Sequence, residues 1–424
     1  MCSTLVMVNM ETKKAPLVLL LILGLTTSTL PTTAHAGSVE QAKRLHDRLA
    51  GVPPSATTLA QMDGFIKQGN VKSAALLAMD NDNFYNIMLK NWFSTWTNVD
   101  GSPLVDLNDY SATAMGLIRD NVSFDQVLYG DIIYVGDDSL VSTLDAAGAV
   151  TTKRHLTPYQ KANNQHYIDL QNALVNPANI ADYTSTARIR NISLKQYLVR
   201  KQQTTVTGIA EVAGVLTTRA AGAAFFSAGT NRRAVRFALK NFLCMDMENL
   251  QDTTRPDFRV RRDVDRAPGG DSRTYKQTCV GCHAGMDALA GAFAYFNFSN
   301  NQVTHTPGAV QAKYNQNNTV FPGGFTTTDN SWINLWIAGP NASIGWNGAD
   351  SGSGAKAFGQ LLSQTNAFSS CMVKRVFKRV CLRDPNSTEA LLVSQLASEF
   401  AAQGRYNMKD LLASVATLPQ CMGE

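Results

Sequence analysis

Long apolar runs are scarce in this 424-residue chain: after residue 36, no segment has the length and apolarity of a membrane-spanning helix. A strong excess of one charge sign is also missing, because 38 Lys and Arg residues face 33 Asp and Glu residues and leave a net charge of +5. We therefore expect no transmembrane anchor in the mature chain and no nucleic acid as a partner.

Several patterns that would indicate other classes of protein are absent too. The chain has no internal repeat, no G-x-x-x-x-G-K-[ST] phosphate-binding loop and no sustained alternation of apolar and polar residues. Alternation is typical of a half-buried strand, whereas apolar residues at three- and four-residue spacing, typical of helices, recur throughout this chain. The sequence therefore predicts a mainly α fold.

The predicted helices follow this spacing. They cover residues 38–49, 57–66, 71–79, 83–96, 110–121, 124–129, 231–244, 356–362, 371–381, 387–403 and 408–415. Ser123 and Asn407 are expected to cap the helices that follow them. Trp332 and Trp336 predict one more short helix. Loops are expected where Gly, Pro, Asp and Ser are frequent, at residues 136–152, 252–270 and 344–354.

The first residues have the features of a secretory signal peptide. Lys13 and Lys14 give a positive start, residues 16–25 form an apolar run, and Ala34-His35-Ala36 fits the small-x-small cleavage rule. Cleavage after Ala36 would place the mature chain in the periplasm, at the cell surface or in the medium. The alternative is an uncleaved anchor, for which the apolar run is too short.

One short motif is specific enough to indicate chemistry: Cys279-Val280-Gly281-Cys282-His283. The pattern C-x-x-C-H is that of covalent c-type haem attachment. Two cysteines three positions apart lie on one side of a helical turn, where their thiols can add to the two vinyl groups of one haem. His283 would then be the proximal ligand of the iron, and its second ring nitrogen needs a carbonyl or carboxylate partner. The motif, which we expect to open a helix, predicts one covalent haem c.

Other uses of a C-x-x-C pair fit less well. A thioredoxin-like redox motif follows a buried strand, whereas residues 273–277 read Arg-Thr-Tyr-Lys-Gln. A structural zinc site needs a second ligand pair at matching spacing, and the chain has none. A two-haem peroxidase would need a second C-x-x-C-H, which is also absent.

Four further cysteines remain after the predicted cleavage: Cys244, Cys371, Cys381 and Cys421. An even number in an exported chain predicts two disulfides. Cys371 and Cys381 share one predicted helix and would lie about 15 Å apart, too far for a bridge. Each is therefore expected to pair with Cys244 or Cys421, in an order that the sequence leaves open. Four free buried thiols are the alternative.

The region of the motif resembles a known family. Residues 279–287, C-V-G-C-H-A-G-M-D, followed by Phe296-Asn297-Phe298, are similar to the signature C-x-x-C-H-x-x-M-D-x-x-G-x-x-x-x-x-F-D. That signature belongs to planctomycete-type cytochrome c-like domains of unknown function, which also occur in proteobacteria. The sequence departs from the family's pattern: Ala288 stands where Pro is usual after the M-D pair, and Asn297 where Asp is usual.

The flanks of the motif extend the resemblance. Residues 214–217, 231–233 and 242–244 resemble the region that precedes the haem motif in this family, and residues 368–412 resemble its C-terminal helical module. The resemblance implies a periplasmic, mostly helical protein that carries haem. It implies no particular substrate.

A six-coordinate iron needs a second axial ligand, Met or His. Met408 is our distal candidate, because it opens the last long predicted helix, an order similar to that of small cytochromes c. The alternatives are an open distal site or another residue among His46, His155, His166, His305 and Met372. Met286 lies too close to His283 on the same helix and is expected to pack in the core. Arg273, in an arginine-rich run, is expected to bind the haem propionates unless that run is a solvated loop.

The sequence therefore predicts an exported mono-haem c-type cytochrome with a helical N-terminal domain, 37–200, and a cytochrome c-like haem domain, 201–424. The second domain would contain long irregular loops and a helical C-terminal module. The expected role is electron transfer with a redox partner protein, and no catalytic residue is predicted. Two alternatives stay open: a peroxidase-like haem enzyme with an open distal site, and a structural haem subunit of an envelope or surface assembly.

Overall fold

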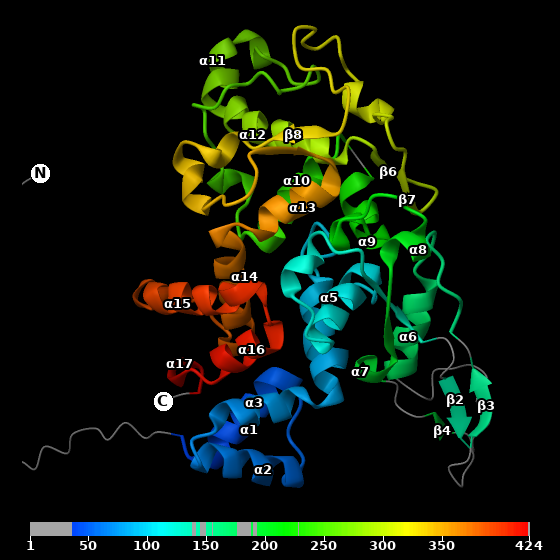
Figure 1. The fold of residues 1–424 in the computed structure, drawn as a ribbon, viewed down its shortest axis with the longest axis vertical. Coiled ribbons are helices and arrows are strands. Elements are labelled where there is room, and N and C mark those ends of the chain that lie inside the picture. Colours follow the sequence, from blue (N-terminus) through cyan, green and yellow to red (C-terminus); the bar gives the residue numbers. More distant parts are fainter. Residues whose placement is uncertain are drawn as a thin grey trace, which may run out of the picture. The chain divides into compact units, whose positions relative to one another are not determined.

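The computed structural model describes residues 36–137, 141–144, 150–154, 156–175, 188–189, 193–227 and 229–422. Within these residues the chain is mainly helical, as the sequence predicts (Figure 1). The predicted signal peptide lies outside the described residues, except for Ala36.

The first three helices form a small group, drawn in blue in Figure 1. They are α1 (Ser38–Ala50), α2 (Ala56–Lys67) and α3 (Val71–Met79), each in contact with the other two. Gly51 ends α1 in the left-handed conformation, with φ of 74°, and donates its N–H to the carbonyl of Asp47. The hydroxyl of Ser55 accepts a hydrogen bond of 3.1 Å from the N–H of Thr58 and so caps α2. These three helices confirm the spacing argument.

The middle of the chain contains shorter helices. A π-helical stretch, η1 (Phe84–Leu89), runs into α4 (Lys90–Ser94), and these are followed by α5 (Asp109–Arg119), η2 (Phe124–Val127), α6 (Gln165–Val175), α7 (Leu194–Tyr197), α8 (Gln203–Thr207), η4 (Gly214–Thr217), α9 (Arg219–Ala221) and the π-helical η5 (Gly222–Phe226). Ser123 lies at the N-cap position of η2, as predicted, but η2 is a single 3-10 turn and the Ser123 side chain makes no capping hydrogen bond. The hydroxyl of Ser123 instead donates to the carboxylate of Asp125 and to the carbonyl of Gly404.

Further α-helices follow in the second half of the chain. They are α10 (Arg232–Phe242), α11 (Ser272–Thr274), α12 (Val280–Ala290), α13 (Gly354–Ser363), α14 (Asn366–Cys381), α15 (Ala390–Ala401), α16 (Met408–Ala416) and α17 (Pro419–Met422). The predicted cap at Asn407 is confirmed, since its side-chain oxygen accepts a hydrogen bond of 3.0 Å from the N–H of Asp410. Between these helices lie the short turns η6 (Met247–Asn249), η7 (Pro268–Gly270), η8 (Tyr275–Cys279), η9 (Gly291–Phe293), η10 (Ala312–Asn315), η11 (Leu335–Ile337), η12 (Pro340–Ile344), η13 (Ser387–Glu389) and η14 (Ala402–Gly404).

Short antiparallel strands are a feature that the sequence did not predict. The pairs are β1 (Ile133–Gly136) with β5 (Leu198–Lys201), β2 (Val141–Leu144) with β3 (Val150–Arg154) and β4 (Arg188–Ile189), β6 (Phe296–Ser299) with β7 (Gln302–His305), and β8 (Ser331–Ile333) with β9 (Ser351–Ser353). Parts of two predicted loops are therefore strands. The predicted helix at Trp332 is wrong as well: Trp332 lies in β8 and Trp336 in a 3-10 turn. Segments this short do not show a period-two pattern, so the sequence could not reveal them.

Two disulfides join distant parts of the chain. Cys244 is bonded to Cys371, with Cα atoms 5.3 Å apart, and Cys381 is bonded to Cys421, with Cα atoms 4.7 Å apart. Both Cys371 and Cys381 lie on α14. The prediction that they share one helix and pair with other cysteines is confirmed, and the structure selects one of the two orders that the sequence left open.

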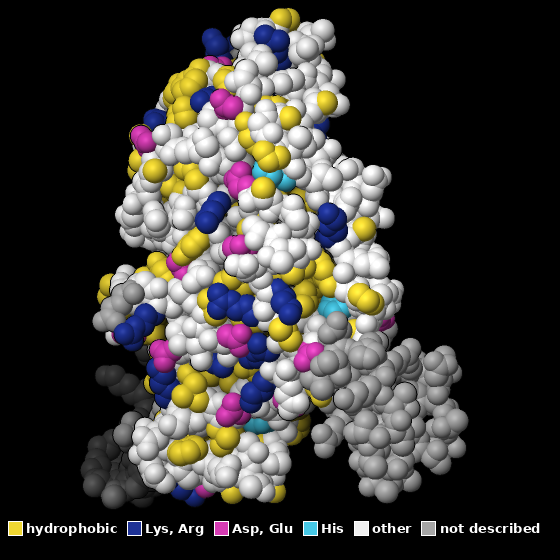
Figure 2. All heavy atoms as spheres, turned by 45° about the vertical axis from the view of Figure 1, so that its right-hand side comes forward, with side chains coloured by type: hydrophobic (Ala, Val, Ile, Leu, Met, Phe, Trp, Pro, Cys, Tyr) yellow, Lys and Arg dark blue, Asp and Glu magenta, His cyan; other side chains and the backbone are white. Residues whose placement is uncertain are grey.

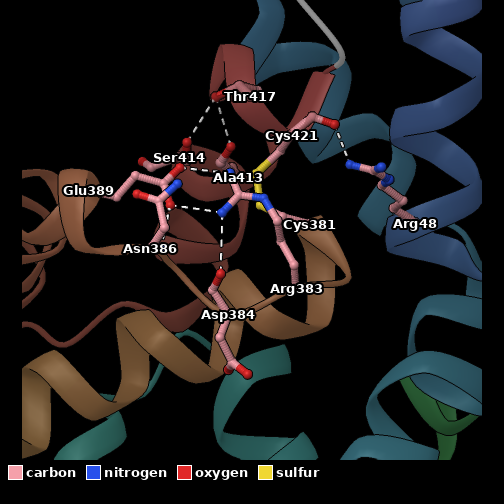
Figure 3. The surroundings of a disulfide bond; sticks show 10 residues. All are labelled: Arg48, Cys381, Arg383, Asp384, Asn386, Glu389, Ala413, Ser414, Thr417 and Cys421. Atoms are coloured by element: carbon pink, nitrogen blue, oxygen red, sulfur yellow. Dashed lines mark hydrogen bonds and ion pairs between the residues drawn. A yellow bond between two sulfur atoms is a disulfide. The ribbon is translucent and has the colours of Figure 1, made fainter. Parts of the chain in front are cut away.

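The Cys381–Cys421 disulfide lies beside the first helix. Figure 3 shows Arg48 of α1 pointing toward the backbone of Cys421, to whose carbonyl it donates a hydrogen bond. Arg44, one turn earlier on α1, donates a hydrogen bond of 2.5 Å to the carbonyl of Met422. The two arginines thus tie α1 to α17, and the disulfide ties α17 to α14.

Buried contacts cross the predicted domain boundary near residue 200. The Trp96 and Phe242 rings meet edge to face with centroids 5.4 Å apart, and Asn241 donates a hydrogen bond of 3.0 Å to the carbonyl of Trp96. Asp109, at the start of α5, accepts hydrogen bonds from the backbone N–H groups at the start of α9. Whether residues 37–200 and 201–424 fold as separate domains stays a prediction.

The surface carries both charge signs. On the face drawn in Figure 2, Lys and Arg side chains are interspersed with Asp and Glu side chains, in keeping with the small net charge. None of the helices in the described part of the chain has the length and apolarity to cross a bilayer.

Candidate haem-attachment site

The C-x-x-C-H motif lies inside a continuous helical stretch. This stretch begins with α11, passes through the π-helical η8 and continues as α12. Its start is capped by Asp271, whose carboxylate accepts a hydrogen bond of 2.8 Å from the N–H of Arg273. The expectation that the motif opens a helix is therefore wrong by about two turns. Cys279 ends η8 and Cys282 lies in the first turn of α12, so both cysteines have a helical backbone and face the same side.

The two thiols of the motif are free. In the described part of the chain, Cys279 and Cys282 are the cysteines outside a disulfide, and both are half-buried. The thiol of Cys282 donates to the carbonyl of Met247 at 3.6 Å and packs against the main core. Cys279 packs against a separate small apolar cluster, Val260, Val264, Tyr275, Val280 and Ala284. Burial, aided by the nearby Glu248 carboxylate, raises the pKa of the Cys282 thiol.

His283 has one ring nitrogen directed at a buried carboxylate. Its Nδ1 lies 3.4 Å from Oδ1 of Asp287, one helical turn further along α12. The Asp287 side chain has no exposed surface, whereas the His283 side chain is 25% exposed. An ionised carboxylate can only accept hydrogen bonds, so the proton of a neutral imidazole in this pair lies on Nδ1 and leaves Nε2 with a free lone pair. That is the state a metal-ligating imidazole needs.

Two arginines surround Asp287. Arg232, at the start of α10, donates from Nε and Nη2 to the two carboxylate oxygens at 2.6 and 2.8 Å. The buried guanidinium of Arg261 lies 3.6 Å away, and the backbone N–H of Arg261 donates to the same carboxylate at 3.2 Å. Burial alone would raise the pKa of Asp287, but Arg261 and Arg232 hold it well below its usual value. The carboxylate is therefore ionised and fixed in place.

The carboxylate of Asp263 balances part of the positive charge of the two arginines. Asp263 accepts two hydrogen bonds from the Arg232 guanidinium, from Nη1 at 2.7 Å and from Nη2 at 2.8 Å. Arg261 also donates to the hydroxyl of Thr230 at 2.8 Å and stacks over the Tyr314 ring at 4.8 Å. These two acidic and two basic residues form what we call the Asp287 cluster: Arg232, Arg261, Asp263 and Asp287. It joins α10, the loop before the motif and α12.

Two arginines from the arginine-rich run before the motif contact residues near them in the fold. Arg266 stacks between Tyr275 and Phe321, with its guanidinium 4.6 and 4.7 Å from the ring centroids. The predicted propionate ligand, Arg273, is paired with Asp271 at 2.8 Å and its side chain is 80% exposed. Arg273 thus lies close to the motif in sequence but outside the buried contacts of the site, and its contact with haem stays a prediction.

Two of the histidines considered as distal ligands have structural roles. His166 accepts a hydrogen bond of 2.8 Å from the N–H of Gly136 at Nε2 and donates one of 2.7 Å from Nδ1 to the carbonyl of Thr157. Both of its nitrogens are used. His46 is buried in α1 and donates from Nδ1 to the carbonyl of Val52 at 2.7 Å.

The other distal candidates are distributed over the fold. His305 lies in β7. Its ring centroid is 4.5 Å from that of Phe296, and its Nε2 is 3.6 Å from Oε2 of Glu211. Met372 is fully buried in α14. His155 lies outside the described residues.

Met408 and Met286 are both buried. Met408 begins α16, which packs mainly against α3, α14 and the helices beside them, whereas α12 packs mainly against α10, η8 and β8. The structure thus places Met408 in a different neighbourhood from the motif, and its role as distal ligand stays a prediction. Met286, on the motif helix itself, is 8% exposed and packs in the core as expected.

The residues present fit a covalently attached haem. Two free thiols at helical three-residue spacing can form the thioether links, and Nε2 of His283 can bind the iron while Nδ1 faces Asp287. Among the residues that the structure describes, no three His, Cys, Asp or Glu side chains are grouped to hold a bare metal ion. Haem attachment needs no such group, because the macrocycle supplies four of the iron ligands.

The sequence revealed the motif but not its supporting residues. It indicated that the imidazole needs a carbonyl or carboxylate partner, and an Asp four positions after His283 was the available signal, since i and i+4 side chains are neighbours on a helix. Arg232 and Arg261 gave no comparable signal, because they lie 55 and 26 residues from Asp287.

No protein-family model, no curated protein and no solved structure matches this chain. The functional assignment therefore depends on the side chains described above.

Proposed function

We propose that this protein is an exported mono-haem c-type cytochrome that transfers single electrons in the periplasm or at the cell surface. The observation that carries the proposal is the state of the motif: Cys279 and Cys282 are free on one helical stretch, and the next residue, His283, faces a buried carboxylate through Nδ1. Among the described residues the other four cysteines form disulfides, so the two free thiols there are those that the motif requires.

Two further features support export. Disulfides such as Cys244–Cys371 and Cys381–Cys421 suit an oxidising compartment, where c-type haem is attached. The first 36 residues have the pattern of a signal peptide. The resemblance of residues 279–298 to planctomycete-type cytochrome c-like domains points the same way.

Each residue of the motif has a separate task. Cys279 and Cys282 would hold the macrocycle against the two apolar clusters that their side chains contact. His283 would bind the iron through Nε2, and Asp287 would keep the ring turned so that Nε2 faces outward. The haem supplies reversible one-electron chemistry, while the ligand, the burial and the nearby charges set its potential.

The test is to express the full chain, signal peptide included, in a bacterium with c-type haem-ligation machinery. The purified periplasmic protein is then examined by intact mass, by haem staining of a denaturing gel and by a pyridine haemochrome spectrum. We expect one covalently bound haem per chain. A colourless protein whose mass is that of the polypeptide alone would refute the proposal.

Cysteine variants supply the matched control. The double variant Cys279→Ala/Cys282→Ala should carry no covalent haem. The variant Cys381→Ala/Cys421→Ala also loses two cysteines, but it should still give a haem-stained band, because its cysteines belong to a disulfide away from the motif. Equal staining of both variants would contradict the assignment of the thioether links.

The spectrum and the native mass of the loaded protein separate electron transfer from the two alternatives. A low-spin ferric spectrum that does not respond to cyanide supports electron transfer. A high-spin spectrum that changes with cyanide indicates an open distal site and hence a peroxidase-like enzyme. A native mass of many chains indicates a structural subunit of an assembly.

A further inference from the structure

The Asp287 carboxylate accepts three hydrogen bonds from two arginines that lie outside α12. Its Oδ1 receives Nε of Arg232 at 2.6 Å, and its Oδ2 receives Nη2 of the same arginine at 2.8 Å and the backbone N–H of Arg261 at 3.2 Å. These three contacts fix both oxygens without any contribution from His283. The acceptor that faces the imidazole is thus already in position, with no exposed surface, before any group is bound.

The nature of this partner affects the basicity of the imidazole. A neutral backbone carbonyl and a carboxylate both accept the Nδ1 proton, but a carboxylate draws that proton more strongly and makes Nε2 a more electron-rich ligand. An electron-rich ligand stabilises the more highly charged ferric iron over the ferrous form. The charge on Asp287 is shared with Arg232 and Arg261, which limits the effect without removing it.

We propose that Asp287 is a positioning residue for the iron: it holds His283 with its proton on Nδ1 and its Nε2 outward, and it lowers the reduction potential of the attached haem. This inference rests on the proposed function, because it concerns a haem ligated by His283. Arg232 and Arg261 act through Asp287 by fixing its orientation.

Two variants of the loaded full-length protein test the inference. Asp287→Asn keeps an oxygen that can accept from Nδ1 but removes the negative charge, so we expect haem to remain attached and the potential to rise. A tenfold change in the one-electron reduction equilibrium would appear as a rise of about 59 mV. Asp263→Asn is the matched control, because Asp263 binds the same Arg232 guanidinium at 2.7 Å but is not paired with His283. Its potential should change by less than that of Asp287→Asn, because Asp263 is connected to His283 only through Arg232 and Asp287.

Spectroelectrochemical titration of the three proteins gives distinguishable outcomes. Equal potentials for wild type and Asp287→Asn overturn this inference and leave the proposed function intact. Equal shifts in Asp287→Asn and Asp263→Asn also overturn it, because they indicate a general effect of charge. A wild-type protein that takes up no haem overturns the proposed function and this inference together.

A charge-conserving variant covers the case in which Asp287→Asn does not accumulate. Asp287→Glu retains the negative charge but moves the carboxylate by one methylene, which disturbs its contact with Nδ1 of His283. We expect its potential to rise in the same direction as that of Asp287→Asn. An unchanged potential in this variant overturns the inference.

Discussion

Cys244 lies just beyond α10 and is disulfide-bonded to Cys371 of α14, 127 positions further along the chain, with Cα atoms 5.3 Å apart. The helix before Cys244 begins with Arg232, which binds Asp287 beside the motif. The disulfide therefore anchors the helix that supports the candidate site to the helix that carries Cys381, the first partner in the second disulfide.

The two disulfides should differ in their contribution to stability. A cross-link that closes a longer loop removes more conformational entropy from the unfolded chain, so the 127-residue loop should contribute about 5 kcal/mol and the 40-residue loop of Cys381–Cys421 about 4 kcal/mol. Urea unfolding of the two double-alanine variants measures both values. A larger loss from Cys381→Ala/Cys421→Ala would contradict the loop-length argument.

Gly285 is required for the packing of the motif helix. A Cβ at this position would overlap the fully buried indole of Trp336, so Gly285→Ala should destabilise the protein by about 1–3 kcal/mol although Ala favours a helix. Gly64 in α2 is the matched control, because a Cβ there meets no atom within 4 Å. Gly64→Ala should stabilise the protein by up to about 1 kcal/mol. If Gly285→Ala, like Gly64→Ala, increased the free energy of unfolding, Trp336 would have to adapt to the added methyl group.

Glu389 should make stability depend on pH in acid. Arg383 donates to both of its carboxylate oxygens at 2.8 and 2.7 Å, the N–H of Asn386 donates at 2.8 Å, and these hydrogen bonds lower the pKa of Glu389 to about 2 (Figure 3). The pKa of Glu389 in the folded protein lies below its ordinary value of 4.5. Its contribution to the free energy of unfolding is therefore present above pH 4.5 and is lost as the pH falls toward 2.

The variant Glu389→Gln isolates this contribution. It should be less stable than the wild type by about 1 kcal/mol at neutral pH, and the difference should shrink as the pH falls from 4.5 to 2. Urea unfolding at several pH values measures it. Glu399→Gln, on the exposed side of α15, is the control and should give a small difference. A Glu389→Gln difference that is constant between these pH values would refute the assignment.

Met408→Leu tests the distal ligand. Met408 is 2% exposed in the core, where leucine has a similar volume, so the variant should lose less than about 1.5 kcal/mol of stability. Because α16 and α12 have different principal neighbours, we expect the haem spectrum of this variant to match that of the wild type. Loss of a low-spin spectrum in Met408→Leu would instead identify Met408 as the axial ligand.

The sequence by itself determined the features that depend on neighbouring residues. Helical spacing located α1, α3 and α10, and Asn407 was recognisable as a cap because capping involves residues two or three positions apart. The distance along one helix excluded a Cys371–Cys381 bridge. The C-x-x-C-H motif is local in the same way, since its cysteines and histidine lie within two turns.

Only the tertiary structure decided which distant residues meet. The choice between Cys244 and Cys421 as the partner of Cys371 depends on how α10 and α14 pack, and no local pattern records it. The short strands also depend on this, because a strand such as β1 is held by hydrogen bonds to β5, more than 60 residues away. The arginines around Asp287 come from separate segments of the chain. The sequence could therefore indicate that His283 needs a partner, but only folding brings Arg232 and Arg261 to Asp287, where they hold its carboxylate in place.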